Sequence, residues 1–375
     1  MGLRLLQQWK PALAVALVAG VAAACGGSGG TDESATKAAE AAKTRLANNP
    51  ALSAMVAAAN KEGALNLNWG LDGRSTLKNL TDAFKTAYGL NIKVTLTPQQ
   101  NMPTNAGKLA QEYQAGKPSS TDAFLGNPES TFGVGPKGKN ALKTIDWAKT
   151  APWTKGLANS DNTALTWVDQ IPGFTYNTTL IPKNEVPKTA QDVLKLTKPI
   201  ASTPYAAQFN ALGSKQAMGI DGVRSYLRSF KPKGYLGCGE LNRIASGEFA
   251  ALWVSCGVNI GDIFAAQGAP VATTVLKDAA IISTRYIGIP KNSAHPNAAE
   301  LWATWLLTPE AQQIMYKGDF NDNMRLPGSK TAKQIAGYEA QGTKFIKLDY
   351  EFAAANPELY DGRFKGELIK LLTGK

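Results

Sequence analysis

Four short polar segments in this sequence have the composition of a small-molecule binding site. Each follows a predicted strand or begins a predicted helix, where backbone N–H groups lack a partner within the helix. Ligands of open α/β sheets bind at the carboxyl ends of the strands, so we expect the four segments to face one groove. The candidate ligand-binding residues are Trp69, Asp72, Arg74, Ser75, Asn127, Ser130, Ser202, Thr203, Tyr205, Ser255 and Asn259.

The segment over residues 69–75 offers the most distinct chemistry of the four. Arg74 and Ser75, with the amides that follow them, can hold an anionic group, and Trp69 can stack on a solute. The competing interpretation is a capped helix that follows a core tryptophan. The other three segments can equally be loops that only connect elements, so the predicted groove is a hypothesis about geometry first.

Residue types that hold metals or carry out catalysis are scarce in this chain. There is one histidine, His295, and no Cys-x-x-Cys pair, so a zinc site lacks support. No Asp-rich loop supplies the several oxygen ligands that a hard cation needs. There is also no nucleophile elbow, Walker loop or His-Glu-x-x-His motif. We therefore expect no cofactor and no enzyme, and a secreted enzyme that uses His295 as a base is the weaker alternative.

The first 30 residues have the pattern of an export signal. Arg4 and Lys10 precede a run of small apolar residues, 12–24, that is too short to span a bilayer. Cys25 and a Gly/Ser linker follow, which resembles a bacterial lipobox, although Ala22 stands where leucine is usual. We predict a signal peptide over residues 1–24, lipidation of Cys25, and a tether with the first helix over 25–60. Ordinary cleavage and release of a soluble protein is the alternative.

Export also affects how the remaining cysteines are interpreted. Disulfides persist in oxidising compartments, so Cys238 and Cys256 are predicted to form one. Two buried free thiols are the alternative.

The composition is that of an exported globular protein. Of the 375 residues, 44% are hydrophobic and 18% are charged, enough apolar material for two packed lobes. The net charge of +11 is spread along the chain without a block of like charges, which argues against a nucleic-acid partner. A positive surface suits anionic lipid or an anionic solute.

Periodicity predicts strands that alternate with helices, which favours a parallel α/β sheet. In the first part of the chain we expect strands over 64–69, 91–96 and 122–125, and helices over 51–61, 76–88 and 105–114. Further on we expect strands over 249–254 and 281–289, and helices over 190–196, 222–230, 240–246, 298–307 and 309–316.

Several motifs occur in the order found in one known family. Residues 57–63, 173–182, 246–251 and 288–312 resemble the opening, lobe crossing, late strand and C-terminal helical entry of extracellular solute-binding proteins. The subgroup that this chain resembles includes ferric-iron, polyamine and phosphonate binders. Its ferric binders carry adjacent tyrosines after the late strand, whereas this chain has no Tyr-Tyr pair, so ferric iron or a ferric chelate is the alternative solute.

The resemblance implies a fold and a role. It implies a two-lobed periplasmic-binding-protein type II-like α/β fold with two crossovers, lobe 1 over 61–168 and 280–330, and lobe 2 over 169–279 and 331–375. It also implies a monomer at the outer face of the cytoplasmic membrane or in the periplasm. This protein would capture a small organic solute, anionic or polar, and deliver it to the membrane subunits of an ABC permease. A passive surface adhesion protein would share the tether but not the α/β order.

Overall fold

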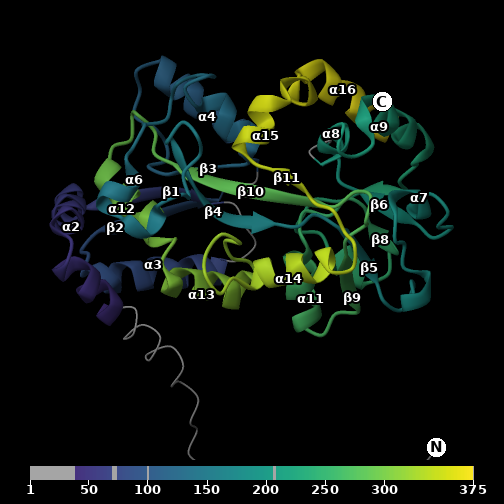
Figure 1. The fold of residues 1–375 in the computed structure, drawn as a ribbon, viewed down its shortest axis with the longest axis horizontal. Helices are drawn as coiled ribbons and strands as arrows, with labels where there is room; N and C mark the ends of the chain where they lie inside the picture. Colours follow the sequence, from purple (N-terminus) through teal and green to yellow (C-terminus); the bar gives the residue numbers. More distant parts are fainter. Residues whose placement is uncertain (1–38, 70–73, 99–100, 206–207, 375) are drawn as a thin grey trace, which may run out of the picture.

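The computed structural model describes residues 39–69, 74–98, 101–205 and 208–374, which form two α/β lobes side by side (Figure 1). Each lobe has its own hydrophobic core. The core of lobe 1 is built around fully buried rings from two distant helices, including Phe84, Trp302 and Trp305. The core of lobe 2 contains Phe209 and Trp253 in the same way.

Some strands of lobe 1 run toward the centre of the molecule, and β10 runs back from it. β1 pairs in parallel with β2, and a parallel bridge between Leu67 and Ala123 places β1 beside the start of β3. β10 runs antiparallel to both β3 and β4. The bounds of these strands are β1 (Ala64–Trp69), β2 (Lys93–Pro98), β3 (Phe124–Gly126), β4 (Ala164–Gln170) and β10 (Ile281–Gly288).

Helices cover the lobe 1 strands on both sides. α3 and α13 lie along one side and α4 along the other (Figure 1). α3 forms because Leu77, Leu80 and Phe84 share one face that packs on the core. The helical segments of this lobe are α2 (Pro50–Glu62), α3 (Arg74–Tyr88), α4 (Met102–Gln114), α5 (Pro128–Val134), α6 (Trp147–Thr150), η1 (Pro152–Thr154), α12 (Pro296–Trp305) and α13 (Pro309–Asp319).

Lobe 2 contains a five-stranded mixed sheet in the order β7-β6-β8-β5-β9. Its strands are short: β5 (Phe174–Asn177), β6 (Ile200–Ser202), β7 (Gly234–Tyr235), β8 (Ala251–Leu252) and β9 (Val271–Thr274). Its helical segments are η2 (Lys183–Glu185), α7 (Ala190–Val193), α8 (Phe209–Leu212), α9 (Gly219–Ser229), α10 (Asn242–Ala245) and α11 (Val258–Ala266).

The chain passes between the lobes at two central connections, residues 171–173 and 275–280. Backbone hydrogen bonds tie the first connection to lobe 2, because Ser255 N donates to Gly173 O at 2.8 Å. A small apolar cluster that includes Ile171, Val275 and Ile335 packs around both connections. The lobe boundary is therefore a packed region rather than a loose linker.

The C-terminal segment crosses the lobe boundary again. It comprises α14 (Lys330–Glu339), β11 (Ile346–Leu348), α15 (Tyr350–Ala355), η3 (Pro357–Tyr360) and α16 (Gly362–Thr373). β11 extends the lobe 1 sheet beside β10, and α15 packs on α5, whereas α16 packs on α8 and α9 in lobe 2. Glu129 of α5 and Lys365 of α16 form an ion pair across the boundary. The lobe boundaries given above stay a prediction, and we expected this segment in lobe 2 alone.

The first described residues are fixed on lobe 1. A helix over residues 39–47 buries Ala42 completely in the lobe 1 core. Arg45 forms an ion pair with Glu310 and lies over the Trp153 ring. Cys25, the signal peptide and the Gly/Ser linker lie outside the described residues. No helix among the described residues is both long and apolar enough to cross a membrane.

The predicted parallel pairing holds for part of each sheet, since β6 also pairs in parallel with β7 and β8, and β10 with β11. β1, β2 and the start of β3 are parallel, but β10 pairs antiparallel with β3, and β5 pairs antiparallel with β8. The reason is that β4 leads out of lobe 1 and β10 leads back into it, so their directions are opposite. The predicted strand over 249–254 is also shorter, because only Ala251–Leu252 form the sheet ladder.

Candidate functional site

The sheet topology brings the four polar segments together in pairs. In lobe 1, the first two segments follow the neighbouring strands β1 and β3. In lobe 2, the last two follow β6 and β8, which are also parallel neighbours, with Ala201 opposite Leu252. Parallel neighbours end at the same edge of a sheet, so each lobe presents two of the predicted segments at one edge.

Asp319 links the first and the fourth segments across the lobe boundary. Thr76 Oγ1, in the first turn of α3, donates to Asp319 Oδ1 at 2.8 Å. Asn259 Nδ2, in the first turn of α11, donates to Asp319 O at 3.0 Å. Segments nearly 190 residues apart in sequence therefore meet at the end of α13, as the groove hypothesis requires of these two.

In the first segment, the structure describes the side chain of Trp69 but not those of Asp72, Arg74 and Ser75. Trp69 is 7% exposed, and its ring contacts those of Trp167 and Trp302 edge-on in the lobe 1 core. This packing agrees with the competing interpretation of Trp69 and gives stacking on a solute no support. Asp72 lies outside the described residues, as do the side chains of Arg74 and Ser75, whose backbone begins α3. An anion-binding role for Arg74 stays a prediction.

The second segment lies at the start of α5. Asn127 caps this helix, since its Oδ1 accepts from Ser130 N at 2.8 Å. Ser130 is 5% exposed, and its Oγ has no hydrogen-bond partner among the described residues. Ser130 also lines a groove of about 440 Å³ between α4, α5, α15 and η3. No contact in the described residues joins this segment to the two segments of lobe 2.

The third and fourth segments are joined by the predicted disulfide. Cys238 and Cys256 are bonded, with their Cα atoms 5.6 Å apart, within the range that disulfides span, so this prediction is confirmed. The Tyr205 hydroxyl lies 2.8 Å from Cys238 Sγ and 3.4 Å from Cys256 Sγ. Thr203 Oγ1 donates to Tyr205 O at 3.4 Å.

The remaining predicted residues of lobe 2 are buried polar groups. Ser255 Oγ accepts from Gly173 N at 3.2 Å and so fixes the first lobe connection. Ser202 Oγ and Asn259 Oδ1 are buried and have no partner within the described part of the chain. Because Asn259 Nδ2 donates to a carbonyl, its Oδ1 must be the free acceptor. Buried polar groups in proteins generally have a hydrogen-bond partner, so water or a solute is a natural partner for these two atoms.

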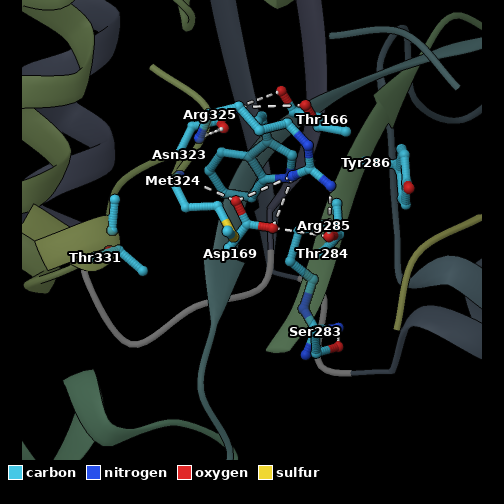
Figure 2. Close-up of polar contacts among 12 residues, drawn as sticks. Thr166, Asp169, Ser283, Thr284, Arg285, Tyr286, Asn323, Met324, Arg325 and Thr331 are labelled. Atoms are coloured by element: carbon cyan, nitrogen blue, oxygen red, sulfur yellow. Dashed lines mark hydrogen bonds and ion pairs between the residues drawn. The ribbon is translucent and has the colours of Figure 1, made fainter. Parts of the chain in front are cut away.

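Sequence reasoning missed Arg285, the most distinctive charged residue at the lobe boundary. Arg285 lies within β10, where Nη2 donates to Gln170 Oε1 at 2.6 Å. Its Nη1 donates to Ser283 Oγ at 2.8 Å (Figure 2). Burial lowers the pKa of Arg285 to about 10, and Asp169 and Tyr205 lie close enough to oppose that shift. Among the described residues Arg285 has no carboxylate within 4.0 Å. Its charge is therefore desolvated without an ion-pair partner.

The nearest carboxylate, Asp169, is already committed to another arginine. Asp169 is fully buried on β4 and accepts from Arg325 Nη1 at 3.0 Å, from Thr284 Oγ1 at 2.7 Å and from Met324 N at 3.1 Å (Figure 2). Successive strand residues face opposite sides, so Asp169 meets Arg325 while Gln170 meets Arg285. Within the described part of the chain, this division leaves the Arg285 guanidinium with the neutral partners Gln170 and Ser283.

Arg285 is contiguous with the predicted lobe 2 segments. Tyr205 is close enough to influence its charge, and Tyr205 contacts Cys256. Gln170 Cβ lies 3.8 Å from the position that a Cβ on Gly257 would occupy, two residues before Asn259. Arg285, Gln170, Tyr205 and residues 256–259 therefore form one polar cluster where the lobes meet, which we call the boundary cluster.

His295 lies away from the boundary cluster. Its Nδ1 is 2.8 Å from Asp122 Oδ2, and its backbone N donates to Asp122 Oδ1 at 3.1 Å. This pair joins the start of α12 to β1, since Asn66 N also donates to Asp122. In the described ranges, no three His, Cys, Asp or Glu side chains group closely enough to hold a metal ion.

Comparison with known proteins identifies the family. Residues 79–345 match the model of the bacterial extracellular solute-binding proteins, and the chain belongs to this family. No curated protein sequence matches it significantly.

Solved structures share the fold at low sequence identity. An ABC transporter protein from Rhodopseudomonas palustris CGA009 aligns with TM-score 0.65 and 16% identity, covering 84% of this chain and 99% of that one. AfuA from Actinobacillus pleuropneumoniae, a periplasmic binding protein with fructose-6-phosphate bound, gives 0.65 and 18%, with 83% and 99% covered. Iron-bound HitA from Pseudomonas aeruginosa gives 0.57 and 16%, with 71% and 90% covered. The predicted two-lobed type II-like α/β fold is thereby confirmed.

Proposed function

We propose that this protein is the solute-binding component of an ABC importer and that it captures a small anionic organic solute between its lobes. The family and the fold support the transport role. The observation that carries the choice of solute is Arg285, a half-buried and desolvated arginine at the lobe boundary that has no carboxylate partner among the described residues. A carboxylate or phosphate of the solute would supply that partner by a bidentate, charge-assisted pair.

Electrostatics favours an anion at this position over a neutral solute. Burial penalises the charge of Arg285, as its lowered pKa shows. Gln170 and Ser283 satisfy two of its N–H donors and leave the rest of the guanidinium for a solute. An anion would remove the desolvation penalty and gain the hydrogen bonds together, so the interaction exceeds that of a surface arginine.

Neutral polar groups would hold the rest of the solute. Ser202 Oγ and Asn259 Oδ1 in lobe 2 are buried without partners in the described residues. Hydroxyl groups can donate and accept, whereas Asn259 Oδ1 can only accept. A solute with hydroxyl or other donor groups beside its anionic end satisfies them, and this description includes sugar phosphates such as the one bound to AfuA.

Lobe closure is the proposed mechanism, and no chemical step is part of it. Arg285 lies on β10, which leads directly out of the connection over residues 275–280, while Tyr205 and Asn259 belong to lobe 2. A solute that contacts both sides binds the closed arrangement better and shifts the population toward it.

We also propose lipidation of Cys25, attachment to the outer face of the cytoplasmic membrane or within the periplasm, and delivery by a monomer to the permease subunits.

Calorimetric titration of Arg285→Gln against the unchanged protein tests the proposal. Suitable probes are fructose 6-phosphate, inorganic phosphate, glucose, putrescine and ferric citrate, screened first by thermal shift. We expect an anionic organic probe to bind and Arg285→Gln to weaken it by about 2–3 kcal/mol, the size of a charge-assisted hydrogen bond to a buried ion. Arg363→Gln is the matched control, because the Arg363 side chain is 96% exposed.

Two outcomes would contradict the proposal. Tight binding of glucose or putrescine with no response to anions would show that the Arg285 charge does not select the solute. Equal loss of affinity in Arg285→Gln and Arg363→Gln would show a nonspecific effect of net charge. Binding of ferric citrate alone would favour the ferric-chelate alternative.

A further inference from the structure

The disulfide of lobe 2 lies within the boundary cluster rather than on the far surface of the lobe. The Tyr205 hydroxyl contacts both sulfur atoms, at 2.8 Å from Cys238 and 3.4 Å from Cys256. The same tyrosine lies close enough to Arg285 to affect its charge. Cys256 is also followed directly by Gly257, where an added Cβ would lie 3.8 Å from Gln170 Cβ, and Gln170 accepts from Arg285 Nη2 at 2.6 Å. The disulfide therefore lies next to the residues that surround the proposed anion site.

The disulfide joins two segments that both shape this site. Cys238 follows β7, and Cys256 immediately precedes Gly257 and the first turn of α11, where Asn259 lies. Around the sulfurs, Leu236, Leu241 and Ile260 form a small apolar cluster that is separate from the main core of lobe 2. Cleavage of the bond is therefore expected to loosen the segments over 203–205 and 236–241 while the main core remains packed.

We propose that the Cys238–Cys256 disulfide positions Tyr205 and residues 256–259 in the boundary cluster and makes solute affinity depend on the redox state of this pair. The inference rests on the proposed function of the boundary cluster. Two thiols cannot approach as closely as two bonded sulfurs, so on reduction one sulfur must leave the position that the Tyr205 hydroxyl contacts. Tyr205 then loses its fixed place, and the lobe 2 side of the boundary cluster becomes less ordered.

The redox step is an ordinary thiol–disulfide exchange. A thiolate of a dithiol reductant attacks one sulfur and forms a mixed disulfide, and its second thiol closes to a cyclic disulfide. The pair gains two electrons and two protons as two thiols, and the dithiol is oxidised by the same amount. Access is available, because Cys238 is half-buried and Tyr205 is 36% exposed.

Hydrogen exchange of the solute-free protein is the first test, since it needs no knowledge of the solute. Oxidised and dithiothreitol-treated protein are compared, with mass spectrometry confirming the state of the thiols. We expect reduction to accelerate amide exchange over 203–205 and 236–241 by a larger factor than in α9, whose exchange reports the loss of global stability. Unchanged exchange at 203–205 overturns the inference, and so does an equal acceleration of these segments and α9, which would mark a loss of global stability alone.

Affinity for fructose 6-phosphate and for inorganic phosphate is the second test. In the unchanged protein we expect reduction to weaken the bound probe at least tenfold, and Cys238→Ser/Cys256→Ser to be equally weak with or without dithiothreitol. Tyr205→Ala should be weak and insensitive to reduction, because the residue through which the disulfide acts is missing. A Tyr205→Ala protein that still loses tenfold on reduction excludes Tyr205 as the link.

The two proposals fail in different ways. If the oxidised protein binds neither probe nor any other anion, the proposed function fails. The redox inference is then tested by hydrogen exchange alone. If an anion binds equally well before and after reduction, the proposed function stands and the redox inference is wrong.

Discussion

Asp169→Asn is expected to destabilise the protein strongly, although Asp169 is outside the boundary cluster. The carboxylate is fully buried and accepts from Arg325 Nη1, Thr284 Oγ1 and Met324 N. An amide keeps one acceptor oxygen but loses the ion pair and turns an NH₂ group toward donors. The Arg325 guanidinium would be left without its counter-ion.

The magnitude follows from how buried each partner is. Removal of one partner from a fully buried ion pair costs about 3–5 kcal/mol. The Arg325 side chain is 29% exposed, so water can reach part of the guanidinium and lower that cost. We therefore expect Asp169→Asn to reduce the free energy of unfolding by about 2–4 kcal/mol.

Urea denaturation followed by circular dichroism measures this loss as a shift of the midpoint at constant slope. Arg325→Met and the double variant complete a thermodynamic cycle that isolates the pair. We expect the double variant to be more stable than the sum of the single effects predicts, because it leaves no unpaired charge. A loss below about 1 kcal/mol for Asp169→Asn, or a coupling energy near zero, would refute the reasoning.

Three further outcomes follow from the structure. Arg285→Met should change the thermal midpoint of the solute-free protein little or raise it, because the variant removes a desolvated charge that has no carboxylate partner; a clear decrease would argue against this. Burial raises the pKa of Tyr88 to about 12, against 10 in the unfolded chain. About 3 kcal/mol of stability that is present below pH 10 should therefore be lost by pH 12. In Tyr88→Phe the urea midpoint should depend less on pH over this range. Reduction of Cys238–Cys256, 18 residues apart, should lower the free energy of unfolding by about 3 kcal/mol through loop entropy, as measured by urea denaturation with and without dithiothreitol.

The parts of the fold that the sequence predicted well have strong local signals. The strand Ala64–Trp69 was predicted with its observed bounds, because its apolar residues alternate and every second side chain is buried. The helix at Pro309 was predicted with its observed start, and there the Thr308 side chain caps it by accepting from Ala311 N. In each case the decisive contacts are between residues close in sequence.

The parts that were missed depend on partners far along the chain. Arg285 stands in the middle of a strand that reads as apolar, and nothing nearby in sequence shows that Gln170 and Ser283 would be its only hydrogen-bonding partners among the described residues. Trp69 is the opposite case. Because it ends a predicted strand, its ring was expected to be available to a solute. Only the packing of Trp167 and Trp302, about 100 and 230 residues later, shows that the core uses it.

The two ends of the described chain are fixed on different lobes. The helix over residues 39–47 is held on lobe 1 by Ala42 and Arg45, whereas α16 packs on α8 and α9 of lobe 2 (Figure 1). The separation between the ends is thus a coordinate of lobe movement. Fluorophores attached near residues 40 and 374 would convert solute capture directly into an energy-transfer signal, and in a molecule held by its N-terminus lobe 2 would be the part that swings.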